Sequence, residues 1–190
     1  MAKDFVTIVS GLPRSGTSMM MQMLEAGGLA ALTDGVRGAD SDNPKGYYEF
    51  EAVKQTKQDA SWLQSAGGKV VKMVYKLLYD LPQDREYRVV FMRRNLDEVL
   101  ASQKKMLDRL GRAGGSLEDE RMKQLFVQQL GEFDRWLAGQ GCFKRLDVNY
   151  KDAIDNPREQ IRRLNEFLGG DLDIEAMAAV IEPTLYRNKL

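Results

Sequence analysis

The sequence predicts an α/β fold with a mostly parallel central sheet flanked by helices, and three observations support this prediction. Apolar runs rich in β-branched or aromatic residues recur at Phe5–Val9, Lys69–Tyr75 and Tyr87–Met92. Segments with apolar residues at helical spacing separate these runs. The first run leads through a glycine-rich turn into a helical pattern. Because continuous apolar runs are typical of strands buried on both faces, alternating with helices they indicate a parallel sheet.

The N-terminal third predicts one helix, a short strand, a long loop and a second helix. Thr17–Ala26 has its apolar residues on one face, and Gly27 ends the pattern. Leu29–Leu32 is expected to form a short strand. Thr33–Tyr47 is polar and glycine-rich, and loops of this length are often functional. Roughly helical spacing predicts a helix over Glu49–Ser65.

The rest of the chain continues the alternation. Asn95 is suited to cap a helix, with Glu98 three residues later as in a capping box. Gly111–Ser116 breaks that helix, and a long helix follows over Leu117–Ala138. We expect a stripe on the long helix to face the core, and its members are Met122, Leu125, Phe126, Gln129, Phe133, Trp136 and Leu137. The remaining predicted elements are a strand over Phe143–Val148 and helices over Arg158–Leu168 and Ile174–Ile181.

Composition limits the classes of function. With 190 residues and no repeat or linker, the chain predicts a single domain over residues 1–190. Its 28 basic and 28 acidic side chains give no net charge, so no overall field would attract nucleic acid. No apolar run approaches the ~20 residues that span a membrane, and no secretory segment precedes the first strand, which predicts a cytoplasmic protein without a membrane span. The single cysteine, Cys142, excludes an internal disulfide and is expected to be a small buried hydrophobe.

Histidine is absent from the sequence. A general base must therefore be a carboxylate, lysine, tyrosine or cysteine, and a histidine-rich metal site is excluded.

The segment GLPRSGTS, Gly11–Ser18, predicts an anion site. Gly11 and Gly16 let the backbone turn so that successive N–H groups point into one hollow at the positive end of the following helix. The phosphate-binding pattern GxxxxGK[ST] matches at both glycines and at Ser18, but Thr17 replaces its lysine and a cation, Arg14, lies inside the loop. The alternative is a merely structural turn.

Two features of Mg²⁺-dependent phosphoryl transfer are missing from the sequence. Kinases and NTPases with this loop use its lysine and a strand-end aspartate that helps to hold the metal. Here the strand Tyr87–Met92 is followed by Arg93 and Arg94. A site rich in cations, with no required metal, fits a sulfuryl group better, since that group carries less charge than a phosphoryl group.

Four segments in order resemble the sulfotransferases that use 3′-phosphoadenosine 5′-phosphosulfate (PAPS). The resemblance covers nearly the whole chain and implies a three-layer P-loop NTPase-like fold. GLPRSGTS is similar to the PKSGTT loop of the small-molecule enzymes, and closer to the PRSGTT of tyrosylprotein sulfotransferases. RNLDEVLAS resembles RNPKDVAVS, KVVKMVYKLLYDLP contains the lysine of the KTHLP segment, and VNYKDAIDNPREQIRRLNEFLG resembles a later YEDLxxDPxxxxxxxxxFLG stretch.

The resemblance implies roles for individual residues. Arg94 and Ser102 correspond to contacts of the 3′-phosphate, and the alternative is an arginine paired with an acidic residue and a serine on a solvated face. Lys72 corresponds to the lysine that neutralises charge on the sulfuryl oxygens and leaving group. The implied contacts of the 5′-phosphosulfate are Gly11, Pro13, Arg14, Ser15, Gly16, Thr17 and Ser18, with Arg14 also counted among the catalytic residues.

Two departures from the family pattern affect the predicted mechanism. The usual catalytic histidine falls on Val74, which cannot take a proton. The tyrosylprotein branch uses a glutamate after the first helix, which here indicates Glu49, with Glu51 second; a glutamate that merely complements a helix dipole is an equal alternative for Glu49. The later RKGxxGDW motif is missing, and Arg187 or Lys189 would have to substitute for it, unless that terminal segment is disordered.

The sequence as a whole therefore predicts an enzyme that transfers a sulfuryl group from PAPS to a hydroxyl or amine acceptor. The expected product is 3′,5′-adenosine bisphosphate (PAP), the base is a carboxylate, and no metal is required. The acceptor is a small molecule or a peptide, and no pattern selects between them or fixes the oligomeric state. Two alternatives are a Mg²⁺-dependent P-loop kinase and a non-catalytic nucleotide-binding relative.

Overall fold

A parallel sheet organises the molecule in the computed structural model, which describes residues 4–35, 38, 46–109, 111 and 119–181. Its strand order is β2-β3-β1-β4-β5, and every neighbouring pair runs parallel. The strands are β1 Phe5–Gly11, β2 Ala31–Leu32, β3 Val70–Lys72, β4 Glu86–Arg93 and β5 Phe143–Asn149. The predicted α/β fold is confirmed.

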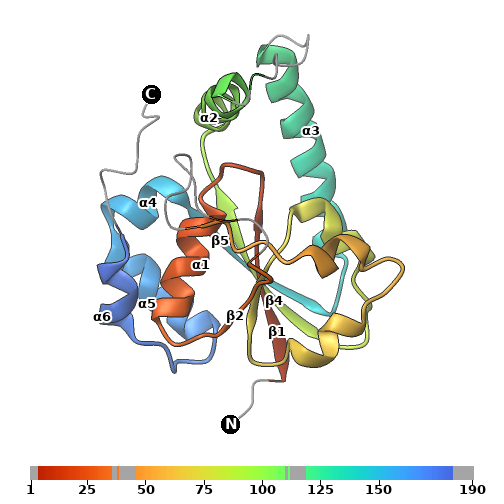
Figure 1. The fold of residues 1–190 in the computed structure, drawn as a ribbon, viewed down its shortest axis with the longest axis vertical. Coiled ribbons are helices and arrows are strands. Elements are labelled where there is room, and N and C mark those ends of the chain that lie inside the picture. The colour runs from red at the N-terminus through yellow and green to blue at the C-terminus, as the bar shows by residue number, and fades with distance from the viewer. Residues whose placement is uncertain (1–3, 36–37, 39–45, 110, 112–118, 182–190) are drawn as a thin grey trace.

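Helices cover both faces of the sheet (Figure 1). The α-helices are α1 Thr17–Ala26, α2 Leu96–Arg109, α3 Asp119–Ala138, α4 Tyr150–Asp155, α5 Pro157–Phe167 and α6 Ile174–Ala179. Three 3₁₀ segments are η1 Glu51–Gln55, η2 Ser61–Ser65 and η3 Tyr75–Asp80. One apolar cluster joins the sheet to α1, α4, α5 and α6, and a second joins it to the 3₁₀ segments, α2 and α3. None of the described helices is long and apolar enough to cross a membrane.

Strand β1 is the central strand, paired with β3 on one side and β4 on the other. All seven of its residues are buried, which explains why most of them are apolar. Parallel strands end at one common edge, and the turn from β1 into α1 therefore lies at the carboxyl edge, where α/β sheets bind ligands. The predicted bounds of α1 are confirmed at both ends.

The predicted helix over Glu49–Ser65 is wrong. Two 3₁₀ segments, η1 and η2, occupy this range. Between them Thr56 is buried, and its hydroxyl donates to the carbonyl of Val53 and accepts from the indole N–H of Trp62. The Asp59 carboxylate accepts from the amide of Ser61, where η2 begins. Such short polar side chains compete with a continuous helix by bonding to nearby groups.

Other predicted bounds need smaller corrections. Strand β3 ends at Lys72, and the chain then turns into η3 rather than continuing as a strand to Tyr75. Helix α4 was not predicted; it begins where the Asn149 side chain accepts from the amide of Lys151 at 2.9 Å. The Asn95 cap is confirmed, because its side chain accepts from the amide of Asp97 at 2.8 Å.

The stripe on α3 is buried only toward the C-terminal end of the helix. Phe133 and Leu137 are buried, and the Phe133 ring packs against the rings of Tyr75 and Phe91. Leu125 is 36% exposed, so the prediction that the whole stripe faces the core is wrong there. A 20-residue helix is about 30 Å long, and its first turns extend past the carboxyl edge of the sheet (Figure 1).

The Asn149 cap gives a testable stability prediction. Asn149→Ala is expected to lower the free energy of unfolding by about 1 kcal/mol, because an amide at the start of α4 loses its acceptor. Asn156→Ala is the matched control, since Asn156 occupies the N-cap of α5 without a side-chain cap hydrogen bond. Urea unfolding of both variants measures the difference, and equal losses would contradict the assignment.

Candidate anion-binding site

The turn between β1 and α1 is compact and adopts left-handed backbone angles. The φ angles are 72° at Arg14 and 100° at Gly16. The Ser15 hydroxyl donates to the carbonyl of Leu12 at 2.7 Å, and the Ser15 amide donates to the same oxygen at 3.2 Å. Pro13 is exposed at the turn. The turn therefore directs the start of α1, with its unsatisfied N–H groups, toward the carboxyl edge of the sheet.

Both glycines of the turn are required by close approach of their neighbours. A Cβ at Gly11 would lie 2.8 Å from the carbonyl oxygen of Met92 on β4. A Cβ at Gly16 would lie 2.3 Å from Cδ2 of Tyr150, at the start of α4. Any larger residue would displace the strand or the ring. The predicted role of the two glycines in shaping the turn agrees with this geometry.

Ser102 and Arg14 meet although they are far apart in sequence. The Arg14 Nε donates to the Ser102 hydroxyl at 3.0 Å. Ser102 is 4% exposed, so the alternative of a serine on a solvated face is wrong. Helix α2 thus contributes a hydroxyl directly beside the turn.

Arg94 follows the last residue of β4, and groups from several elements hold its side chain. Its Nε donates to the Glu98 carboxylate at 2.8 Å, and its Nη1 donates to the carbonyl of Arg14 at 3.2 Å. Its guanidinium lies 4.4 Å from the centre of the Tyr150 ring. Arg94 is thus paired with an acidic residue, and the same contacts place its guanidinium beside the anion loop. Burial raises the pKa of the Tyr150 phenol.

Lys72 reaches the same place from β3. Its amine donates to the Ser18 hydroxyl at 3.2 Å and to the carbonyl of Tyr47 at 2.7 Å. Ser18 is the second residue of α1, following the buried Thr17. The loop lacks a lysine of its own at Thr17, and an amine from a neighbouring strand lies beside the helix start instead.

The two arginines that follow one another at the end of β4 have different partners. Arg93 pairs with Asp134 of α3 at 2.7 Å and with Asp147 of β5 at 3.0 Å. Arg145 pairs with the same two aspartates. This closed network joins α3 to β4 and β5. Of these two arginines, Arg94 is therefore the one whose contacts reach the anion loop.

The segment that contains Glu49 is hydrogen-bonded to the residues that follow β2. The Glu49 carbonyl accepts from the Thr33 hydroxyl at 3.0 Å and from the amide of Asp34 at 3.3 Å. The side chain of Asp34 accepts from the amide of Glu51 at 2.6 Å. Glu49 is half-buried and lies outside η1, whereas Glu51 begins η1 and pairs with Lys54 at 2.6 Å.

Tyr48 precedes Glu49 in a left-handed conformation with a φ of 54°. Its hydroxyl donates to the carboxylate of Glu25 on α1. Burial and this hydrogen bond raise the pKa of the Tyr48 phenol well above its usual range.

Val74, at the position expected for a histidine base, is 41% exposed, and Arg187 lies outside the described residues.

Sequence reasoning did not assign Tyr150 or Glu98 to the site. Tyr150 lies in the segment similar to YEDL, which was the only indication available, and Glu98 was assigned to a capping box. Across the part of the chain that the structure describes, no group of three or more acidic or cysteine side chains could hold a metal ion. Cys142 is half-buried, and burial raises the pKa of its thiol, as suits a small hydrophobe.

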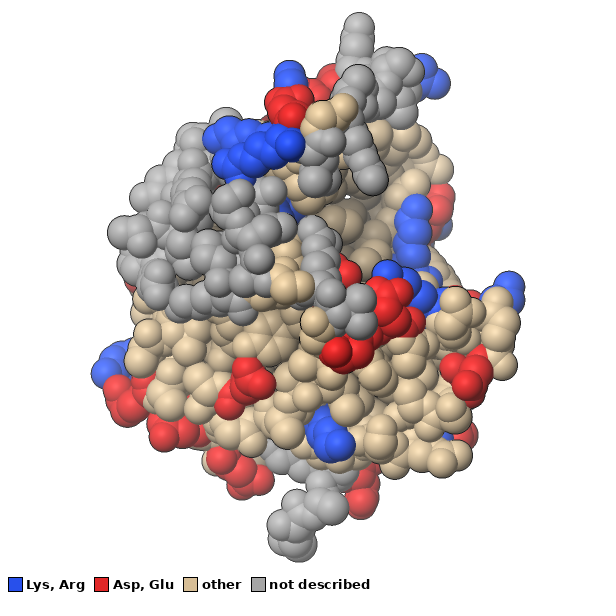
Figure 2. All heavy atoms as spheres, viewed as in Figure 1, with Lys and Arg blue, Asp and Glu red and all other residues tan. Residues whose placement is uncertain are grey.

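The surface shown in Figure 2 carries Lys and Arg side chains in small groups among acidic and uncharged residues, in keeping with the balanced charge.

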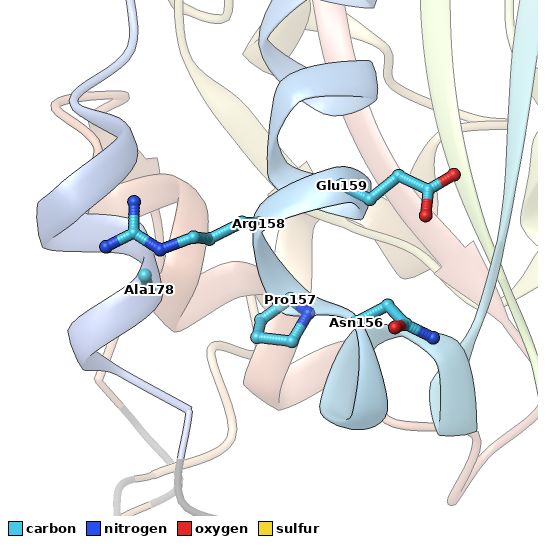
Figure 3. A pocket seen from close by; sticks show the side chains of 5 residues that line it. All are labelled: Asn156, Pro157, Arg158, Glu159 and Ala178. Carbon is cyan, nitrogen blue, oxygen red and sulfur yellow. The ribbon is translucent and has the colours of Figure 1, made fainter.

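A separate hollow of about 280 Å³ lies where α4 meets α5 (Figure 3). Its lining residues are Asn156, Pro157, Arg158, Glu159 and Ala178. Arg158 pairs with Glu175 of α6 at 2.6 Å, which neutralises its charge, and no residue of the anion loop lines this hollow.

Solved structures share this architecture. The sulfotransferase domain from the curacin biosynthetic pathway matches with a TM-score of 0.53 and 14% identity, over 93% of this chain and 77% of that one. The fold is that of the sulfotransferases. The sulfotransferase domain of a Synechococcus olefin synthase matches with a TM-score of 0.51 and 14% identity, over 97% of this chain and 80% of that one. A sulfotransferase from Alicyclobacillus acidocaldarius matches with a TM-score of 0.50 and 15% identity, over 96% of this chain and 87% of that one.

These comparisons confirm the predicted resemblance at the level of the fold. No protein-family model and no curated protein sequence matches the chain.

Proposed function

We propose that this chain is a PAPS-dependent sulfotransferase that acts on a hydroxyl or amine of a small-molecule or peptide acceptor and releases PAP without a metal. The observation that carries the proposal is the position of Lys72, 3.2 Å from Ser18 at the start of α1. This amine supplies a cation beside a loop that has Thr17 in place of the kinase lysine. The sulfotransferase fold supports the same conclusion.

The residues around the loop fit a 5′-phosphosulfate. Helix-start N–H groups and the positive end of the helix favour an anion, and Arg14 and Lys72 add two charges. Charge-assisted hydrogen bonds from such groups are stronger than neutral ones. Thr17, as the first residue of α1, adds a hydroxyl at this position. Arg94 and Ser102, which contact Arg14, are proposed to complete the site on the side of the 3′-phosphate.

In the proposed reaction the acceptor oxygen forms a bond to sulfur while the bond from sulfur to the 5′-phosphate oxygen breaks. Bound PAPS supplies the activated sulfuryl group. Lys72 stabilises the negative charge on the sulfuryl oxygens and on the leaving phosphate. The Glu49 carboxylate takes the proton of the acceptor. We prefer Glu49 to Glu51, because Glu49 is half-buried whereas Glu51 is exposed, and a general base is favoured by a partly apolar setting that raises its pKa.

Arg94→Ala tests the nucleotide site. We expect it to weaken PAP binding by ~1.5 to 3 kcal/mol, the scale of a hydrogen bond to a charged group. Calorimetric titration measures the change. Arg93→Ala is the matched control, because it removes the same group one residue away, where the partners are Asp134 and Asp147. Unchanged affinity in Arg94→Ala would contradict the assignment of the 3′-phosphate site.

A further inference from the structure

A buried ion pair lies behind the anion loop. Glu98 is 5% exposed although it carries a carboxylate, and its oxygen accepts from Arg94 Nε at 2.8 Å. The side chains of Glu98 and Arg94 are 7% and 9% exposed. Removing two charges from water is unfavourable, so a pair of this kind contributes little to stability as such. Its position suggests that it determines where the Arg94 guanidinium lies.

Arg94 contacts the loop at Arg14, whose backbone is left-handed. The Nη1 of Arg94 donates to the carbonyl of Arg14 at 3.2 Å. Arg14 has a φ of 72°, a left-handed conformation that residues other than glycine adopt only when their surroundings hold them there. The hydrogen bond from Arg94 is one of the contacts that hold it.

The Tyr150 ring lies between Arg94 and Gly16, another loop residue with a positive φ. The guanidinium of Arg94 covers one side of the Tyr150 ring, with 4.4 Å between them. The same ring lies against Gly16 so closely that a Cβ there would be 2.3 Å from Cδ2. Tyr150 is 6% exposed and has little freedom to move. Arg94 therefore contacts Arg14 directly, and it contacts the Tyr150 ring that packs against Gly16.

We propose that Glu98 is a positioning residue for the anion loop, and that it acts through Arg94. Its carboxylate orients the guanidinium, the guanidinium fixes the Arg14 carbonyl and the Tyr150 ring, and these two fix the direction of the loop N–H groups before an anion binds. The proposal rests on the proposed function in so far as the anion is the 5′-phosphosulfate. It adds to the proposed contact of Arg94 with the 3′-phosphate, because a misdirected loop weakens every nucleotide with a 5′-phosphate.

Two nucleotides separate these roles. Glu98→Ala is titrated with PAP and with 5′-AMP, which lacks the 3′-phosphate, at one ionic strength. We expect both affinities to fall at least tenfold. Glu98→Gln keeps an oxygen that accepts from Arg94 and should weaken both less than threefold. Unchanged affinities in Glu98→Ala, or a loss confined to PAP, would overturn the proposal.

Amide hydrogen exchange of the ligand-free protein tests the loop independently of what it binds. The Ser15 amide donates within the turn and reports its order. We expect its exchange to be at least tenfold faster in Glu98→Ala. Glu86→Ala is the matched control, since it removes a paired carboxylate at the other end of β4 and should leave this rate unchanged. Unchanged exchange in Glu98→Ala would overturn the proposal.

Failure of the proposed function gives a different result. Wild-type protein would then fail to bind PAP or would show a Mg²⁺-dependent preference for ATP, and the exchange of Ser15 would decide the role of Glu98 alone. Should Glu98→Ala not fold, Glu98→Asp withdraws the carboxylate by one methylene group. It is expected to raise the Ser15 exchange rate at least threefold, and an unchanged rate would overturn the proposal.

Discussion

Lys72→Met is expected to slow sulfuryl transfer by about 100- to 1,000-fold, the effect of removing a preorganised group that stabilises transition-state charge. Methionine keeps much of the apolar stem but removes the amine that lies beside Ser18 and the carbonyl of Tyr47. Because PAP lacks the sulfuryl oxygens, its affinity should fall much less than the rate. Single-turnover formation of sulfated product, with any acceptor that the wild type uses, measures the effect.

A nearby lysine provides the control for this prediction. Lys76→Met removes an exposed amine four residues later, on η3, and should leave the rate within twofold of the wild type. A Lys72→Met variant that retains more than a tenth of the wild-type rate would remove Lys72 from the proposed mechanism.

Glu49→Gln is expected to lower turnover about 100-fold, since an amide cannot take the proton of the acceptor. The change preserves size and leaves the backbone contacts of Glu49 with Thr33 and Asp34 in place. Affinity for PAP should therefore stay the same, and titration beside the kinetic assay checks that separation. Glu51→Gln should lose less than threefold. A fully active Glu49→Gln variant excludes this residue as the base, and a slow Glu51→Gln variant would assign the role to Glu51.

Elements with a strong local pattern were predicted closely. β1 is buried along its whole length, and α1 begins at the loop and ends at a glycine, so local sequence determines both. The helix predicted over Glu49–Ser65 failed because bonds of the Thr56 hydroxyl interrupt it. Periodicity identified the apolar face of α3. It cannot show which part of that face the rest of the protein covers, and Leu125 lies in a part that is exposed.

The site was predictable where a motif encodes it. The loop, Lys72, Arg94 and Ser102 were found by pattern, and the structure brings them together. Their roles toward a nucleotide stay predictions. The packing of Tyr150 on Gly16 joins distant parts of the chain, so no local pattern could reveal it. The spacing of Glu98 from Asn95 suits a helix cap equally well, and only the fold shows its pairing with Arg94.

The most direct test of the central claim is calorimetric titration of the wild-type protein with PAP, ADP and ATP, each with and without Mg²⁺. We expect micromolar binding of PAP that is independent of the metal, with ADP at least tenfold weaker. A Mg²⁺-dependent preference for ATP would contradict the sulfotransferase assignment and make a kinase the working hypothesis.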